Sequence, residues 1–120
     1  MTFVKTKGGG LQETGAKDIP LDFSHDNLLR LLNELIIDKC NYTHQDFANW
    51  ARKYHMFCIT QLDNGNDLGQ IEDILRDIDM QWDASLFNTY STDQLLNLDL
   101  STIKFPVDLL NNWLTQVKDL

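Results

Sequence analysis

Apolar residues recur at the spacing of an α-helix in four stretches of this chain, and this pattern limits the possible folds more than any other feature. Residues recurring at intervals of three and four lie on one side of a helix with 3.6 residues per turn. The clearest case lies in residues 24–41, where one face would carry Leu28, Leu31, Leu32, Leu35 and Ile36. We therefore expect a series of amphipathic helices that pack their apolar faces together.

Capping residues mark where these helices begin. Ser24 precedes the first stretch and suits an N-cap, where its hydroxyl accepts a hydrogen bond from an unpaired backbone N–H. Thr43 with Asp46, and Ser91 with Gln94, have the spacing of a capping box. The pattern thus predicts helices over 24–41, from 43 to between 55 and 58, over 67–82, from 91 or 92 to 98, and over 106–118.

Other segments give weaker signals. Ile59 and Thr60 are β-branched, which favours an extended backbone after the second helix. Residues 84–90 fit no pattern, and residues 100–104 are expected to be a connector. The stretch Gly8–Gly10 interrupts regular structure near the N-terminus, where residues 2–4 suit one short strand.

The fold class that follows is all-α, a compact bundle of about four to five short helices with an irregular N-terminal arm. We expect residues 1–21 to form the arm and residues 22–120 to form the helical domain. The apolar fraction of 42% and the charged fraction of 23% are ordinary for a globular protein. No apolar run approaches the roughly 18 residues of a membrane span, and no secretory signal is visible, so we expect a cytoplasmic protein without a membrane partner.

The net charge of −8 is unevenly distributed. Acidic and basic residues balance over 1–62, whereas residues 63–120 contain eleven acids against Arg76, Lys104 and Lys118. Such a field repels nucleic acid and attracts basic partners. We therefore expect no nucleic-acid partner and a basic protein partner.

The predicted third helix concentrates these acids on the side opposite its apolar stripe. Asp73 with Asp77, and Asp79 with Asp83, are like-charged pairs at i,i+4, which cost a few tenths of a kcal/mol each. The local sequence offers no cation to relieve the second pair. We interpret this cost as a sign of a binding surface, which would comprise Glu72, Asp73, Asp77, Asp79 and Asp83, with Asp67 and Asp63 from the adjacent turn.

In size and composition the chain resembles small acidic helical proteins that bind and silence a toxin or a defence enzyme. We accordingly predict a non-catalytic, inhibitor- or immunity-type protein that binds a basic effector, such as a nuclease toxin, through the acidic face of its third helix. One alternative is an assembly protein that binds or self-associates through apolar surface, with Trp82, Phe87 and Tyr90 as its patch. The other is a small enzyme that uses a cysteine or a histidine.

Metal and cofactor motifs are weak. Cys40, His44, His55 and Cys58 are zinc-ligand types in two close pairs. A helix over 44–55 would separate the two histidines by about 16 Å at a rise of 1.5 Å per residue, too far to share one ion. The acidic turn beginning at Asp63 lacks the glycine and glutamate that an EF-hand loop requires at its sixth and twelfth positions. We therefore predict no metal site, no cofactor and no catalytic residues.

Overall fold

The structure is a computed structural model that describes residues 3–5, 11–13, 17–63, 65, 69–91, 93–94 and 99–120, with backbone alone at 3–5, 11–13 and 63. The predicted all-α class is confirmed. The main elements in chain order are α1 (His25–Ile36), α2 (His44–Asp63), α3 (Gln70–Thr89), the 3₁₀ helix η1 (Leu100–Thr102) and α5 (Val107–Lys118). None of the helices in this described part is long and apolar enough to cross a membrane.

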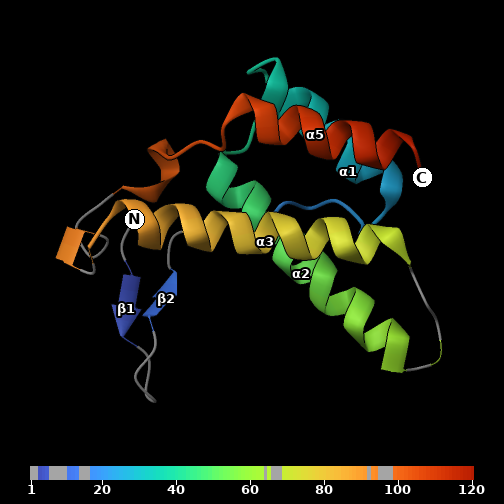
Figure 1. Cartoon of the computed structure of the whole chain (residues 1–120), viewed down its shortest axis with the longest axis horizontal. Helices are drawn as coiled ribbons and strands as arrows, with labels where there is room; N and C mark the ends of the chain where they lie inside the picture. The colour runs from blue at the N-terminus through green and yellow to red at the C-terminus, as the bar shows by residue number, and fades with distance from the viewer. Residues whose placement is uncertain are drawn as a thin grey trace.

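The N-terminal arm contains a short two-stranded ribbon rather than the single strand predicted at residues 2–4. Strand β1 (Phe3–Lys5) pairs antiparallel with β2 (Leu11–Glu13), and Val4 lies opposite Gln12. Figure 1 shows the ribbon apart from the four long helices, near the C-terminal half of α3.

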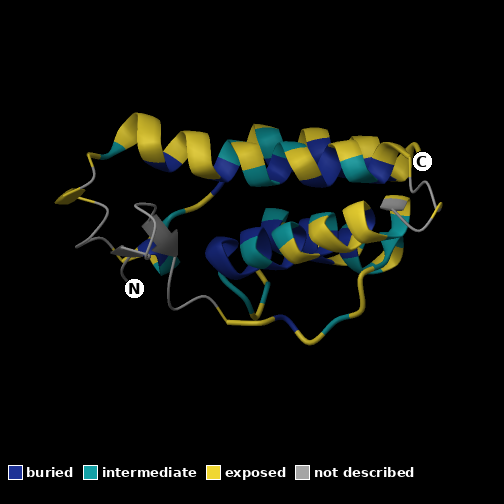
Figure 2. Ribbon diagram, turned by 90° about the horizontal axis from the view of Figure 1, so that it is seen from below, coloured by how far each residue is buried: buried dark blue, intermediate teal, exposed yellow. Residues whose placement is uncertain are grey.

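The four long helices form two layers. α2 packs mainly against α3, and α1 packs mainly against α5. Figure 1 shows α3 and α5 in front of α2 and α1, and Figure 2 shows the buried faces of both layers turned toward each other. The apolar stripes of the sequence therefore meet between the layers, where burial removes them from water.

Aromatic side chains fill the centre of this core. Trp50 of α2, Trp82 of α3 and Trp113 of α5 are each 2% exposed or less. Phe105, in the connection before α5, lies edge-on to Trp82 and Trp113, with ring centroids 5.2 and 5.1 Å away. Edge-to-face pairs add to the free energy gained from burial alone. The connection predicted over residues 100–104 also contributes to the core, because Leu100 of η1 is fully buried.

The predicted helix caps are present. The Ser24 hydroxyl accepts the Asn27 N–H at 3.2 Å. At α2, Thr43 Oγ1 accepts a hydrogen bond from the Asp46 N–H at 3.1 Å, and Asp46 Oδ2 accepts one from the Thr43 N–H at 3.1 Å. The same reciprocal pair links Ser91 and Gln94. These motifs satisfy backbone groups within four residues of each other, so a short sequence window contains all the information they need.

The end predicted for the first helix, near residues 40–41, is wrong. α1 ends at Ile36, because Asp38 adopts a left-handed conformation with φ of 57°. The Asp38 N–H bonds to the Leu35 carbonyl and the Lys39 N–H to the Glu34 carbonyl, the two bonds of a Schellman motif. Glycine usually occupies the left-handed position, so an aspartate there gave no clear stop signal.

The ends predicted for the second and third helices are also wrong. α2 continues to Asp63, so Ile59 and Thr60 are helical rather than extended. α3 runs from Gln70 to Thr89 instead of 67–82, which places the unassigned residues 84–90 almost entirely in the helix. Leu86 explains the extension of α3: it lies four residues after Trp82, is fully buried and prolongs the core stripe by one turn.

The last predicted helix starts one residue later than expected, and the helix predicted before it is only partly described. α5 begins at Val107, with Pro106 as its N-cap. Residues 93 and 94 are helical after Ser91, and residues 92 and 95–98 of the predicted 91–98 helix lie outside the described residues.

Residues 17–21 lie along α2. Ile19 is 6% exposed and belongs to the core. The Lys17 N–H donates to Asp46 Oδ1 at 2.7 Å, and the Trp50 indole N–H donates to the Leu21 carbonyl at 3.1 Å. This part of the arm therefore covers the first half of α2.

Candidate functional site

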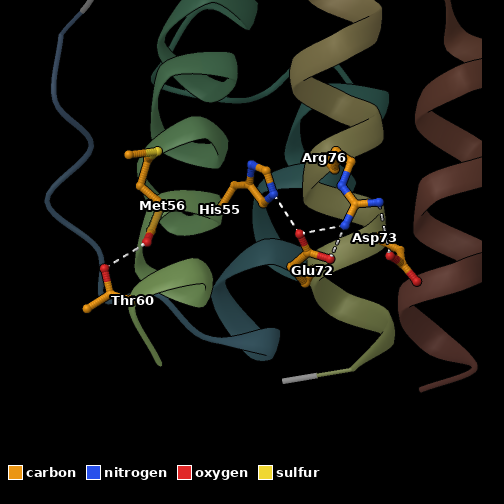
Figure 3. Close-up of polar contacts among 6 residues, drawn as sticks. All are labelled: His55, Met56, Thr60, Glu72, Asp73 and Arg76. Atoms are coloured by element: carbon orange, nitrogen blue, oxygen red, sulfur yellow. Dashed lines mark hydrogen bonds and ion pairs between the residues drawn. The ribbon is translucent and has the colours of Figure 1, made fainter. Parts of the chain in front are cut away.

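The acidic residues predicted as a binding face lie on three sides of α3, and the described ones each contact other side chains of the protein. Glu72 lies on the side toward α2. Its Oε1 accepts a hydrogen bond from His55 Nε2 at 2.7 Å and from Arg76 at 2.8 Å. Figure 3 shows the carboxylate between the two donors. The hydrogen bonds from Arg76 and His55 lower the pKa of Glu72 and hold it ionised.

Asp79 and Asp83 also face α2, where Arg52 lies between them. Arg52 Nε is 2.9 Å from Asp79 Oδ1, and its Nη2 is 3.6 Å from Asp83 Oδ1. The expectation that no cation relieves this pair is therefore wrong, because the cation comes from another helix. Burial raises the pKa of Asp83, and Arg52 opposes that rise. The local repulsion that suggested a functional surface is thus partly a structural ion pair.

Asp77 faces α5 on the opposite side of α3. Its Oδ2 accepts the Trp113 indole N–H at 2.8 Å, and its Oδ1 lies 3.4 Å from Gln81 Nε2. Trp113 is fully buried, so its N–H needs an acceptor at the edge of the core. Asp77 therefore stabilises the packing of α5 on α3 as well as adding negative charge.

Asp73 is the most exposed of the five, with 69% of its side chain accessible. Its carboxylate lies 3.6 Å from Arg76 Nη1. It also lines an open cleft of about 300 Å³ between the start of α3 and the end of α5, together with Asp119 and Leu120. Asp67 lies outside the described residues, and so does the side chain of Asp63, the last residue of α2.

The outer midline of α3 is apolar, which the sequence interpretation missed. Met80 is 61% exposed, Phe87 is 51% exposed, and Ala84 lies exposed between them. Their i, i+4, i+7 spacing places them on one side of the helix, opposite the core stripe. The signal was visible only for a helix that continues past residue 82. We call Met80, Ala84 and Phe87 the apolar midline.

Carboxylates lie beside this apolar midline and in line with it. Asp79 and Asp83 lie on the side that pairs with Arg52, and Asp77 lies on the side toward α5. Asp73 lies seven residues before Met80, in line with the midline, where it also lines the cleft beside α5. The three residues of the aromatic patch predicted as an alternative have different environments. Phe87 is exposed, Trp82 is buried in the core with 1% exposure, and Tyr90 is partly buried against the core. That patch is therefore not a single surface.

The cysteines and histidines occupy separate environments. Cys40 and Cys58 are free thiols, and burial raises the pKa of Cys58 to about 11, which keeps it protonated at neutral pH. His25 Nε2 donates to the Val117 carbonyl at 2.7 Å, and His55 bonds to Glu72.

His44 and His55 lie on one unbroken helix, which keeps them apart as the sequence argument required. Within the described ranges no three His, Cys, Asp or Glu residues are placed to hold a metal ion.

Comparisons of this chain with protein-family models, with curated proteins and with solved structures gave no match.

Proposed function

We propose that the protein is a non-catalytic binding module that engages a basic protein through the outer face of α3. The observation that carries the proposal is the apolar midline, Met80, Ala84 and Phe87, with Asp79 and Asp83 along one side of it and the exposed Asp73 in line with it. An apolar strip with a charged rim has the composition of a protein interface, whose centre is depleted of charge and enriched in aromatic residues and methionine.

The charge balance of this face supports a cationic partner. α3 carries five carboxylates, and among the described residues only two guanidinium groups pair with them. Arg52 pairs with Asp79 and Asp83, and Arg76 pairs with Glu72 and Asp73. The face therefore stays negative after its internal pairing. Lysine or arginine side chains of a partner would add to these pairs, and the field would speed association.

The two components of the face would contribute differently. Full burial of a methionine or phenylalanine side chain stabilises by about 1.5–3 kcal/mol, whereas an exposed ion pair contributes about 0–1 kcal/mol. We therefore expect Met80 and Phe87 to supply most of the affinity, and the acids to supply selectivity for a basic surface. Inhibition of a basic effector, such as a nuclease toxin or a defence enzyme, would follow if the acids covered its cationic groove.

The experiment starts with the full chain immobilised and exposed to an extract of the cells that make it, at low and at high salt. Retained proteins are identified by mass spectrometry, and the purified partner is then titrated by calorimetry. We expect a basic partner whose affinity falls about tenfold or more for Met80→Ser with Phe87→Ser. Asp73→Asn with Asp83→Asn should slow association, mainly at low salt.

Two exposed positions away from this face serve as matched controls. Ile37→Ser removes an exposed apolar side chain just after α1, and Asp22→Asn removes an acid before α1. Both should leave binding unchanged. A partner that binds the Met80 and Phe87 variant as tightly as the unmodified protein, or that is itself acidic, would refute the proposal.

A second function, self-association, is favoured by a different surface. Met56, Ile59 and Leu62 are 59%, 39% and 57% exposed at the C-terminal end of α2. Neighbouring exposed apolar residues on one helix can mark a contact between copies. Sedimentation of the purified chain tests this: a dimer that dissociates in Met56→Ser with Ile59→Ser supports it, and a monomer at all concentrations refutes it.

A further inference from the structure

A small pocket lies between the end of α1 and the beginning of α5. Its volume is about 120 Å³. Leu35 and Ile36 of α1 and Leu110 of α5 contribute apolar walls, and His44, Lys104 and Asp38 are its polar residues. None of these residues belongs to the face of α3 proposed to bind a basic protein.

The mostly buried side chain of His44 gives this pocket a hydrogen-bond donor. The residue is only 6% exposed, and its Nδ1 accepts the Phe105 N–H at 2.9 Å. Burial lowers the pKa of His44 to about 4, so the ring is neutral at pH 7 and carries its single proton on Nε2. Within the described residues this Nε2–H has no hydrogen-bond partner. It is not one of the side-chain polar atoms in the described residues that are fully buried without a partner, so the His44 Nε2–H remains accessible to water, and a bound acceptor would replace that water.

The charges around the pocket favour a single negative charge on that acceptor. The ammonium of Lys104 lies at the rim, close enough to help lower the pKa of His44. It is 3.5 Å from Asp38 Oδ1, and both side chains are more than half exposed. The first turn of α5 adds a positive helix terminus without a side-chain cap. Because Asp38 already offsets part of the Lys104 charge, the site suits a monoanion better than a phosphate dianion.

We propose that this pocket binds a carboxylate attached to a short aliphatic group. One carboxylate oxygen would accept the His44 Nε2–H, the other would pair with Lys104, and the aliphatic group would contact Leu35, Ile36 and Leu110. The carboxylate can come from a free short-chain acid or from the C-terminus of a peptide that ends in an aliphatic residue. Both sources present the same chemistry to the pocket.

Nuclear magnetic resonance of the imidazole nitrogens of the full chain measures this binding directly. The probes are isovalerate, its neutral isostere isovaleramide, and an N-acetylated tetrapeptide that ends in leucine. We expect a saturable chemical-shift change of His44 Nε2 with isovalerate. The affinity for isovaleramide, measured in the same way, should be at least tenfold weaker. If the tetrapeptide binds more tightly than isovalerate, the natural source of the carboxylate is a peptide C-terminus. If isovalerate binds more tightly, the source is a free short-chain acid.

Substitutions separate a built site from adventitious binding. In His44→Asn the side-chain oxygen can still accept the Phe105 N–H but cannot supply the Nε2–H donor, and isovalerate affinity, measured by calorimetry, should fall about tenfold or more. Lys104→Met should weaken binding similarly. Asp38→Asn should strengthen it several-fold, because Lys104 is released from its partner. Lys118→Met, at the far end of α5, is the matched control and should change nothing.

Three results would overturn the proposal. They are the absence of a saturable His44 shift in the folded protein, equal affinity for isovalerate and isovaleramide, and unchanged affinity in both Lys104→Met and Asp38→Asn. The last two variants alter exposed side chains, so the test does not depend on whether His44→Asn folds. A titration that leaves the unfolding temperature unchanged at saturating isovalerate would also count against binding.

Discussion

The two ends of α2 have opposite surroundings. At its N-terminal end, His44, Gln45 and Asp46 are polar and at most 6% exposed. At its C-terminal end, Met56 and Leu62 are apolar and more than half exposed. Within one helix, therefore, the polar end is buried and the apolar end faces water, the reverse of what residue type alone favours.

The neighbours of each end explain the difference. The first turns of α2 are covered by residues 17–21, by η1 and by Phe105, and Lys17 and Phe105 bring hydrogen-bond partners for Asp46 and His44. Asp46, for example, accepts the backbone N–H groups of Lys17 and Thr43. The last turns of α2 extend away from α1 and α5 (Figure 1). Burial in this protein is thus decided by what surrounds a position, and His44 and Asp46 are buried where backbone N–H groups reach them.

The largest expected effect compares two phenylalanines on this helix. Phe47 is fully buried and Phe57 is 38% exposed. Phe47→Ala should lower the free energy of unfolding by about 4 kcal/mol through lost burial and a residual cavity. Phe57→Ala should cost less, about 1–2 kcal/mol, because Phe57 is already 38% exposed to water and less surface is lost from the core. Urea unfolding of both variants measures the difference, and equal losses would show that the ends of α2 do not differ as described.

An intermediate effect concerns His44 and pH. Its pKa is lowered from 6.5 to about 4 by burial first, and then by Lys104. As pH falls, the unfolded chain binds this proton before the folded one does. The stability that the protein has with His44 buried and neutral is therefore fully present above pH 6.5, and part of it is lost as pH falls from about 6.5 to about 4. At 1.36 kcal/mol per pKa unit, the loss is roughly 3 kcal/mol.

Unfolding of His44→Asn over the same pH range isolates this contribution, since carboxylates also titrate there. The variant should be less stable at pH 7 but should lose less stability between pH 6.5 and pH 4. Parallel curves for the variant and the unmodified protein would contradict the assignment of a buried neutral imidazole.

The smallest expected effect concerns the middle of α2. Arg52→Met keeps the aliphatic part of the side chain and removes the cation between Asp79 and Asp83. Partly exposed ion pairs contribute little, so we expect a loss of about 0.5–1 kcal/mol, largest at low salt. If adding Asp79→Asn and Asp83→Asn to the Arg52→Met variant restores its stability, the lost stability came from repulsion between the two acids. A loss above about 2 kcal/mol would place Arg52 among the buried structural residues.

The sequence determined the features whose causes lie within a few residues. The helix class follows from the stripes at 3.6-residue spacing, and the caps at Ser24, Thr43 and Ser91 follow from bonds spanning three positions. It also determined that the second half of the chain would be acidic.

The helix ends at Asp63 and Thr89 were missed. Leu86 continues the core stripe of α3 beyond residue 82. The mostly exposed residues 59–62 stay helical although two of them are β-branched and have lower helix propensity.

Only the tertiary structure decided which residues share a surface. Arg52 reaches Asp79 across 27 positions, Trp113 reaches Asp77 across 36, and Phe105 reaches His44 across 61. Each contact depends on how two helices or a loop are placed in space, and no local pattern encodes that placement. The same packing turned a predicted acidic face into an apolar midline with acidic flanks. It also brought the ends of α1 and α5 together around a buried histidine.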